Sequence, residues 1–304
     1  MNYSFSDIFG VTVQYQQGTE NFLLQIHTFA RAAVATRRCC VSTQVEKRVM
    51  KTVEMASVSN ALAVEWQRRL LWAMEGKPYR EDTEPEKRKI LVLINPFGGA
   101  GAAAGNWAVA RPMLENSHID MTVKHTEYQN HAYEIVNGNL NPGQFDGIVT
   151  VSGDGLIHEV VNALLTREDW HLFKDTITIG CIPGGTGNGL VKSLLSHTKE
   201  NYSVLDAAFK VAKGRRIHMD LTELDCEWEK KKIYSFLSVA WAIIADVDIN
   251  SEAIRCCGPP RFTIWGAWRT LFKRHYPGSL TFNGRGIQNR NEVSANKPQT
   301  VAEE

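Results

Sequence analysis

The sequence lacks an excess of either charge. It contains 34 Lys and Arg residues and 33 Asp and Glu residues. Domains that bind nucleic acid usually carry a clear basic excess, so the overall charge gives no support for such a partner. We therefore expect no nucleic acid among the partners of this protein.

Long apolar runs and paired cysteines are also missing. The longest apolar run, 233–245, is shorter than the roughly 20 residues of a membrane-spanning helix, and Met1 is not followed by the pattern of a signal peptide. The six cysteines have no zinc-site spacing, so no metal site is predicted. The sequence predicts a cytoplasmic protein with reduced thiols that is soluble or bound peripherally to a membrane.

Three glycine-rich turns occupy the middle of the chain. They lie at 95–101, 152–155 and 183–189, and each follows a β-branched apolar run and precedes a helical pattern. Ligands of open α/β sheets bind at the carboxyl ends of the strands, and glycine lets a ligand approach the backbone closely. Backbone N–H groups at such an edge suit phosphate, so the pattern predicts a nucleotide site.

Asp154 stands between two glycines at a strand end, which makes it the first candidate for a chemical role. The alternative is a helix N-cap, where Asp is common. In the third turn, Thr186 can donate its hydroxyl to phosphate and Asn188 can brace the loop or meet a ligand oxygen. Glu159 can orient a metal or a catalytic partner, although a solvated helix carboxylate is the more frequent case.

The order of predicted elements divides the chain into three regions. In residues 1–87, β-prone runs at 9–15 and 22–26 and a helix from about 57 to 74 predict a small module that docks a partner or packs on the core. Residues 88–214 alternate strands with helices, the last over 190–213, and end at Gly214. Residues 215–304 turn to strands, at 215–225, 228–237 and 238–245.

Two patterns in the last region are candidates for ligand or membrane contact. Asp246 and Asp248 follow an apolar run, and one of them could face a cationic or metal ligand. Residues 261–276 have the spacing of an amphipathic helix that contacts a membrane or packs on the α/β domain. Its apolar stripe contains Ile264, Trp268, Leu271 and Phe272, widened by Trp265, and its flanking cations are Arg269, Lys273 and Arg274.

The three turns and their spacing resemble those of the diacylglycerol-kinase-like lipid kinases. The stretch 236–252, with Arg255, Arg261 and Phe262, resembles the sphingosine kinase family in particular, and the likeness covers about residues 88–283. It implies an α/β fold, with a doubly wound nucleotide-binding domain, an incomplete antiparallel β-sandwich domain and a small N-terminal α+β module. It also implies transfer of the γ-phosphate of ATP, with Mg²⁺, to the primary hydroxyl of a sphingoid base.

The resemblance assigns roles to individual residues. Asp154 is implied as the catalytic base, and Asp248 as the contact of the sphingoid amine. The residues implied around the nucleotide are Asn95, Gly98, Gly99, Gly101, Thr126, Ser152, Gly153, Gly155, Glu159, Gly184, Gly185, Thr186, Gly187, Asn188, Glu252, Arg255 and Arg261. Those implied around the lipid are Asp154, Ser238, Ile243, Ile244, Asp248 and Phe262.

Two features depart from the family pattern. The first turn carries Phe97, Ala100 and Ala102 where members often have Lys or Arg, which predicts weaker nucleotide binding. The family's second domain is longer and supplies an Asp-Gly-Glu stretch that this sequence does not contain. The alternative function is therefore a truncated, non-catalytic relative that binds nucleotide or lipid, or docks to a full-length kinase.

Overall fold

The computed structural model describes residues 4–17, 21–38, 41–226, 230–258, 260–276, 280–282 and 299–301. The chain divides into two compact units, Met1–Ser238 and Val239–Glu304. None of the described helices combines the length and the apolar character that crossing a bilayer requires. Cys181 and Cys226 form no disulfide bond with any residue that the structure describes.

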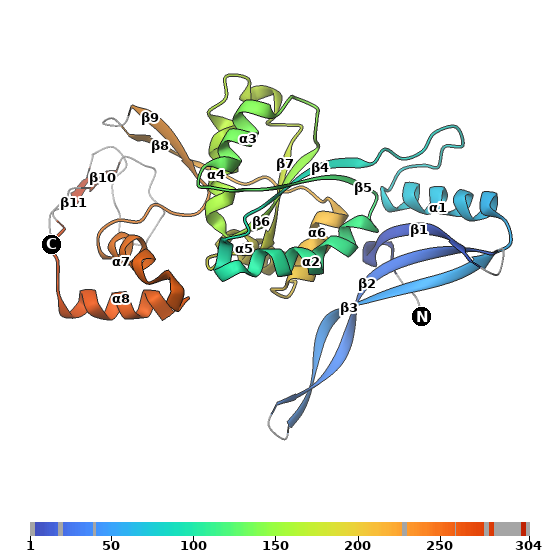
Figure 1. Ribbon diagram of the computed structural model, residues 1–304, viewed down its shortest axis with the longest axis horizontal. Helices are drawn as coiled ribbons and strands as arrows, with labels where there is room; N and C mark the ends of the chain where they lie inside the picture. Colours follow the sequence, from blue (N-terminus) through green and yellow to red (C-terminus); the bar gives the residue numbers. More distant parts are fainter. Residues whose placement is uncertain are drawn as a thin grey trace. The chain divides into compact units, whose positions relative to one another are not determined.

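A four-stranded parallel sheet forms the centre of the first unit (Figure 1). Its strands are β4 (Arg88–Ile94), β5 (Ile119–His125), β6 (Gly147–Ser152) and β7 (Thr178–Pro183), in the order β5-β4-β6-β7. The chain runs from β4 to one side and then returns to the other, which is the topology of a doubly wound sheet. The predicted α/β fold and its parallel strands are confirmed.

Helices cover both faces of this sheet. Successive side chains of β4 point to opposite faces, and each face packs against its own pair of helices. Ile90, Val92 and Ile94 pack with α2 (Ala102–Glu115) and α6 (Val204–Lys213). Leu91 and Leu93 pack with α3 (His131–Asn139) and α4 (Asp154–Leu165) on the other face. A strand that is buried on both faces needs an uninterrupted apolar run, and β4 has one.

The region 190–213 forms two helices, so the single predicted helix is wrong. α5 (Gly189–His197) ends before Lys199, whose φ of 55° is left-handed, and α6 begins after Ser203. The hydroxyl of Ser203 accepts a hydrogen bond from the N–H of Asp206 at 3.0 Å, which caps a new helix. Gly214, with a φ of 62°, ends α6 as predicted.

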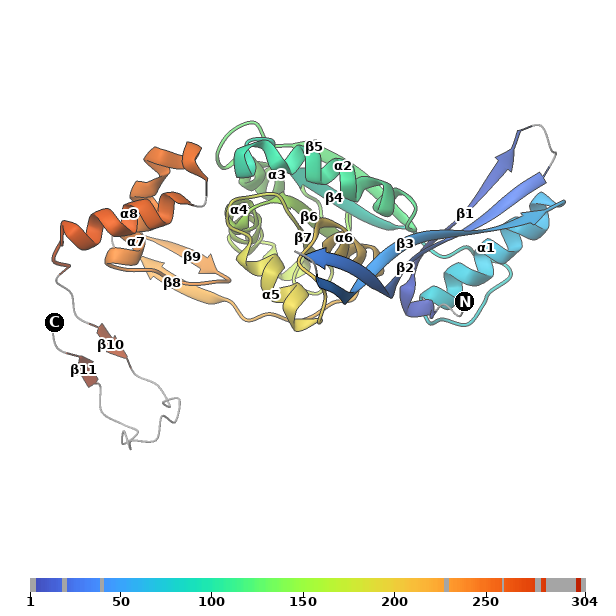
Figure 2. The same ribbon diagram turned by 90° about the horizontal axis from the view of Figure 1, so that it is seen from below.

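The N-terminal module is an antiparallel sheet closed by one helix. Its elements are η1 (Phe5–Asp7), β1 (Ile8–Gln16), β2 (Asn21–Arg38), β3 (Val41–Ser57) and α1 (Asn60–Met74). The long β2–β3 hairpin, visible in Figures 1 and 2, was not predicted, because basic residues interrupt its apolar pattern. Phe9 and Phe29 join the cluster that contains Phe209 of α6, so the module packs on the α/β core.

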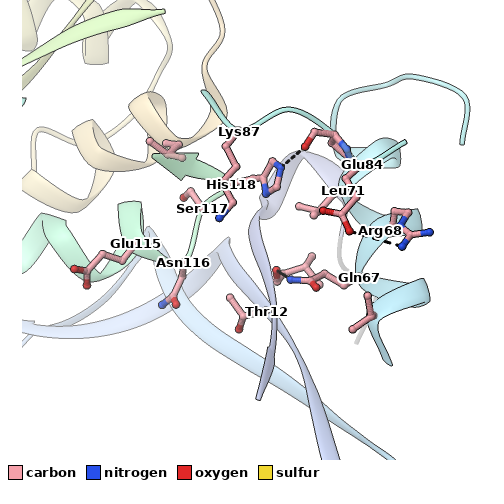
Figure 3. Close-up of a pocket in the computed structure, with 14 residues that line it drawn as sticks. Thr12, Gln67, Arg68, Leu71, Glu84, Lys87, Glu115, Asn116, Ser117 and His118 are labelled. Carbon is pink, nitrogen blue, oxygen red and sulfur yellow. Dashed lines mark hydrogen bonds and ion pairs between the residues drawn. The ribbon is translucent and has the colours of Figure 1, made fainter. Parts of the chain in front are cut away.

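Gly10 permits this close packing. A Cβ atom at Gly10 would lie 1.8 Å from the carbonyl oxygen of Asn116, in the turn between α2 and β5. A cavity of about 270 Å³ lies between β1, α1 and this turn (Figure 3). Beside it, His118 Nε2 donates to the carbonyl oxygen of Pro85 at 2.7 Å. None of the residues that line this cavity belongs to the glycine turns.

After α6, the chain forms the antiparallel pair β8 (Thr222–Cys226) and β9 (Lys231–Ser235), which confirms the hairpin predicted there. The predicted strand over 238–245 is wrong, because α7 (Ile243–Ser251) begins within it. A short apolar run does not distinguish strand from helix. The side chain of Asn250 donates to the carbonyl oxygen of Asp246 at 2.7 Å, a contact between successive helical turns.

The second unit continues with η4 (Glu252–Cys257), α8 (Pro260–Leu271) and the antiparallel pair β10 (Leu280–Phe282) and β11 (Gln299–Val301). α8 lies within the predicted amphipathic segment 261–276, apart from its first residue. Arg269, expected to be a flanking cation, instead turns to α7, where its Nε lies 3.0 Å from Asp246 Oδ2. Two further short helices, η2 (Gly98–Gly101) and η3 (Trp170–Leu172), belong to the first unit.

Candidate active site

The three glycine turns lie side by side at the carboxyl ends of β4, β6 and β7. A Cβ atom on Gly98 would lie 3.2 Å from the carbonyl oxygen of Gly184. A Cβ atom on Gly185 would lie 2.2 Å from the Cα atom of Gly153. Only glycine allows the second and third turns to approach this closely. Their backbones therefore form one continuous surface at the edge of the sheet.

Three helices begin at this surface. α2 starts directly after the first turn, and α4 and α5 start within the second and third turns, at Asp154 and Gly189. The first N–H groups of a helix have no intrahelical partner, and the helix dipole adds positive potential at the same end. The surface can therefore bind the oxygens of a phosphate chain without many cationic side chains.

Asp154 lies where these elements meet. Its Oδ2 accepts a hydrogen bond from the N–H of Gly189 at 2.6 Å, and its Oδ1 accepts one from the N–H of Leu190 at 3.1 Å. Asp154 is the first residue of α4, but its carboxylate caps the neighbouring helix α5. Each carboxylate oxygen keeps a further lone pair, so this carboxylate is held by the backbone and can still accept a proton.

Asn188 braces the third turn. Its Oδ1 accepts hydrogen bonds from the N–H groups of Gly184 at 3.2 Å and Gly185 at 3.1 Å, and its Nδ2 donates to the Gly185 carbonyl at 2.7 Å. The hydroxyl of Tyr202, from the loop between α5 and α6, hydrogen bonds to Asn188. Burial and then the charge of Asp154 raise the pKa of Tyr202, and the bond to Asn188 opposes them. No motif in the sequence marks Tyr202.

Asn95 and Thr126 shape the opposite side of the surface. Asn95 Oδ1 accepts a hydrogen bond from the N–H of Phe97 at 3.0 Å, which tightens the first turn. Thr126 is buried directly after β5, and its N–H donates to the carbonyl of Ile94 at 2.8 Å. Ser152 is also buried, and its hydroxyl donates to the carbonyl of Gly153 at 2.9 Å. All three are positioned by strand ends.

Glu159 faces the beginning of α3. The backbone N–H groups of Asn130, Ala132 and Tyr133 lie near its carboxylate. Burial has the largest effect on Glu159 and raises its pKa, although these N–H groups act in the opposite direction. Its Oε2 is buried and has no hydrogen-bond partner among the described residues. Glu159 is therefore half-buried against the start of α3 and is not a solvated helix carboxylate.

The described residues contain no group of three His, Cys, Asp or Glu side chains that could hold a metal ion. Mg²⁺ usually keeps several waters and binds through substrate phosphates with one or two carboxylates. Asp154 is the carboxylate that lies among the turns, so this surface fits a Mg²⁺ ion that arrives with a nucleotide.

Most residues expected around the lipid belong to the second unit; Ser238 is the exposed last residue of the first. Asp248 is exposed on α7, and Ile244 precedes it by one turn on the same face. Ile243 is exposed as well. Asp246 is already engaged, because its carboxylate accepts a hydrogen bond from Tyr276 and pairs with Arg269. Of the two carboxylates, Asp248 is the one available to a ligand.

Glu252 and Arg261, expected near the nucleotide, form an ion pair with each other. Arg261 is buried, and its guanidinium carbon lies 4.5 Å from the ring centroid of Phe262. The side chain of Arg255 lies outside the described residues.

Residues 89–224 match the diacylglycerol kinase catalytic domain. The chain is 39% identical over 196 residues to sphingosine kinase 1 of Arabidopsis thaliana, covering 64% of this chain and 40% of the relative. It is 35% identical over 237 residues to sphingosine kinase 2 of Homo sapiens, covering 74% of this chain and 36% of that relative. It is 37% identical over 199 residues to sphingosine kinase 1 of Caenorhabditis elegans, covering 64% of this chain and 42% of that relative.

The chain spans less than half the length of these relatives. The likeness includes all three glycine turns, which lie inside the matched domain. Residues 89–224 therefore form a diacylglycerol kinase catalytic domain, and the relatives that the chain resembles are sphingosine kinases.

Proposed function

We propose that this protein is a lipid kinase that transfers the γ-phosphate of ATP to the primary hydroxyl of a sphingoid base. The observation that carries the proposal is the position of Asp154, which lies among three glycine turns with both carboxylate oxygens fixed by backbone N–H groups. The names of the relatives support a sphingoid base as the acceptor.

The chemistry of phosphoryl transfer fits this arrangement. Such transfer depends mainly on positioning and on stabilisation of phosphate charge, with one group to take the proton of the attacking hydroxyl. The N–H groups at the starts of α2 and α4 bind the phosphate oxygens, because the first two N–H groups of α5 already donate to Asp154. A Mg²⁺ ion bound together with ATP would neutralise part of the phosphate charge. Asp154 then accepts the proton of the lipid hydroxyl through a lone pair that its backbone contacts leave free.

The lipid contact is made by the second unit. Asp248 is a carboxylate on the same face of α7 as Ile244, whose side chain is 68% exposed. A sphingoid base has an ammonium group next to a long apolar chain, so it needs a negative charge beside apolar surface. In this proposal Asp248 binds the amine, and Ser238, Ile243, Ile244 and Phe262 contact the remainder of the lipid.

Peripheral contact with a membrane from the cytoplasmic side is part of the same proposal. A sphingoid base resides in a bilayer, and an amphipathic helix that lies in the interface gives a kinase access to it. Four large apolar side chains of the segment 261–276 are exposed: Ile264, Trp268, Leu271 and Phe272. The ring centroids of Trp268 and Phe272 lie 4.2 Å apart, so they form one aromatic patch.

Transfer of labelled phosphate from ATP to sphingosine by the purified chain tests the proposal. Asp154→Asn keeps the side-chain shape but removes the base, so we expect kcat to fall by about 10²-fold or more. Binding of ATP, measured by calorimetry, should persist. Full activity of the variant would remove Asp154 from the mechanism. ATP binding without turnover by the parent chain would support the alternative of a non-catalytic relative.

The role of Asp248 is tested with the same assay. Asp248→Ala removes a contact to the bound lipid, so we expect KM for sphingosine to rise far more than KM for ATP. Because Asp248 is exposed and its carboxylate makes no hydrogen bond or ion pair with any described residue, the variant should fold normally. Equal increases in the two KM values would argue against a contact with the amine.

A further inference from the structure

A second and larger cavity opens at the end of the sheet opposite to the glycine turns. Its volume is about 560 Å³, within the range of roughly 300–1,000 Å³ that is typical of small-ligand sites. It reaches Asp146 and Thr178, beside the starts of β6 and β7, and extends along β7 to Cys181. None of its lining residues belongs to the three glycine turns. The kinase site proposed above leaves this cavity without a role.

The walls of the cavity are largely apolar. Val149 of β6 and Ile179 of β7 supply the sheet side, and Val191, Leu194 and Leu195 of α5 supply the helix side. β7 is the last strand of the sheet, so the cavity follows an edge that no further strand covers. An elongated apolar space of this kind fits a single alkyl chain.

The rim of the cavity carries more positive than negative charge. Its two acids already have partners: Glu200 pairs with Arg48 and Lys210, and Asp146 accepts a hydrogen bond from the N–H of Lys89. Arg215 and Arg216 also line the cavity, are exposed, and make no ion pair with any residue that the structure describes. These two arginines can therefore pair with an anion from outside the protein.

The cations at the rim also affect the pKa values of their neighbours. Burial lowers the pKa of Lys213, and the nearby charges of Arg215, Arg48 and Arg88 lower it further, against the opposing effect of Asp7. Burial likewise lowers the pKa of Arg88; the charges of Asp146 and Glu75 oppose that effect, and the charge of Arg216 adds a smaller one in the same direction as burial. Cations that repel one another in this way would be stabilised by a negative group at the rim.

We propose that this cavity binds a single-chain amphiphile with an anionic head group. The alkyl chain lies between β7 and α5, and the head group pairs with Arg215 and Arg216. A fatty acid and a lysophospholipid with a terminal phosphate share this chemistry. The site is separate from the proposed kinase site, and its test needs no kinase activity.

Binding is measured with the whole chain, by displacement of fluorescent cis-parinaric acid below the critical micelle concentrations. Palmitate and palmitoyl lysophosphatidic acid distinguish the two sources, and hexadecanol is the neutral control. We expect at least one anion to bind with a Kd that rises with salt. Hexadecanol should bind more weakly than that anion, by about tenfold or more. Equal binding of hexadecanol, or displacement of the probe by ATP, would overturn the proposal.

Two variants test the location. Arg215→Ala with Arg216→Ala should weaken anion binding about tenfold or more and reduce its salt dependence. The matched control, Lys87→Ala with Lys124→Ala, removes two exposed cations outside this cavity and should bind normally. Ala207→Leu fills the cavity from α6 and should abolish binding without lowering Tm. Unchanged binding in both the arginine and the leucine variants would place the amphiphile elsewhere.

Discussion

At the scale of single residues, the hydroxyl of Tyr202 stabilises the brace of the third glycine turn. Tyr202→Phe keeps the ring and removes the bond to Asn188. A neutral hydrogen bond contributes about 0.5–1.5 kcal/mol, so we expect KM for ATP to rise about two- to tenfold. The value of kcat should change less, because Asp154 keeps its own contacts with Gly189 and Leu190. Steady-state kinetics with varied ATP measures both constants.

Tyr79→Phe is the matched control for this experiment. Tyr79 also donates its hydroxyl to a side chain, Glu65 Oε1 at 2.6 Å, but it precedes the catalytic domain. Its removal should leave KM for ATP unchanged. If Tyr202→Phe has the kinetics of the parent, the tyrosine does not position Asn188 in the working enzyme.

Sequence could identify some residues of the site but not their partners. The sequence predicts the glycines and Asp154 at strand ends, and the structure brings these turns together at one edge of the sheet. The brace provided by Asn188 was foreseen, since its bonds are local. The capping of α5 by Asp154 and the contact of Tyr202 join segments that are distant in sequence, and no local pattern encodes such pairs.

At the scale of elements, the apolar stripe of α8 gives a test of membrane contact. Trp268→Ala with Phe272→Ala removes two rings that are 51% and 55% exposed. We expect weaker sedimentation with anionic liposomes and an unchanged Tm, because no buried side chain is lost. If the stripe instead packs on the core, stability should fall by about 3–5 kcal/mol for each ring that is removed.

α1 offers a matched pair for comparison. Leu62 and Trp66 are each 51% exposed and lie one turn apart, so Leu62→Ala with Trp66→Ala removes a similar apolar surface elsewhere. This variant should sediment like the parent. Equal loss of liposome binding in both double variants would show a general effect of apolar surface and not a role for α8.

The two errors in predicted elements have different causes. The run 238–245 is rich in β-forming residues, and it does not reveal the contacts that accompany α7. Asp246 accepts a hydrogen bond from Asn250 one helical turn away, and it also contacts Arg269 and Tyr276, which are distant in sequence. The break between α5 and α6 had a visible signal, because Ser203 and Asp206 have the spacing of a helix cap. The polar run 198–203 between the two helices is a second signal of the same break.

At the scale of the whole molecule, Glu200 joins the N-terminal hairpin to the core. Its side chain is 3% exposed and pairs with Arg48 of β3 at 2.8 Å and Lys210 of α6 at 2.8 Å. Breaking a buried ion pair from one side costs about 3–5 kcal/mol, so Glu200→Gln should lower the free energy of unfolding by about that amount at pH 7. Denaturation in urea measures the change.

The dependence of this effect on pH follows from the pKa of Glu200. Burial opposes its ionisation, but the bonds and charges of Arg48 and Lys210 prevail and lower its pKa from 4.5 to about 2. The stabilisation is therefore complete above pH 4.5 and is lost as the pH falls towards 2. The difference between parent and Glu200→Gln should shrink over that interval.

Glu46→Gln is the control for Glu200→Gln. Glu46 lies 3.9 Å from Arg31 and is 67% exposed, so its loss should change stability by less than about 0.5 kcal/mol. A difference between parent and Glu200→Gln that stays constant from pH 4.5 to 2 would contradict the assignment of the effect to the charge of Glu200.

The contact between the three glycine turns also governs when the site can exist. Gly98 lies beside Gly184, and Asp154 accepts a hydrogen bond from Gly189. These pairs are far apart in sequence, so the whole surface needs the chain from the first turn to the start of α5. Such non-local contacts form late in folding, after long loops have closed. During synthesis, a growing chain therefore has no nucleotide site until α5 has left the ribosome. A partly made chain cannot present this surface, which is complete only when the whole α/β domain has formed.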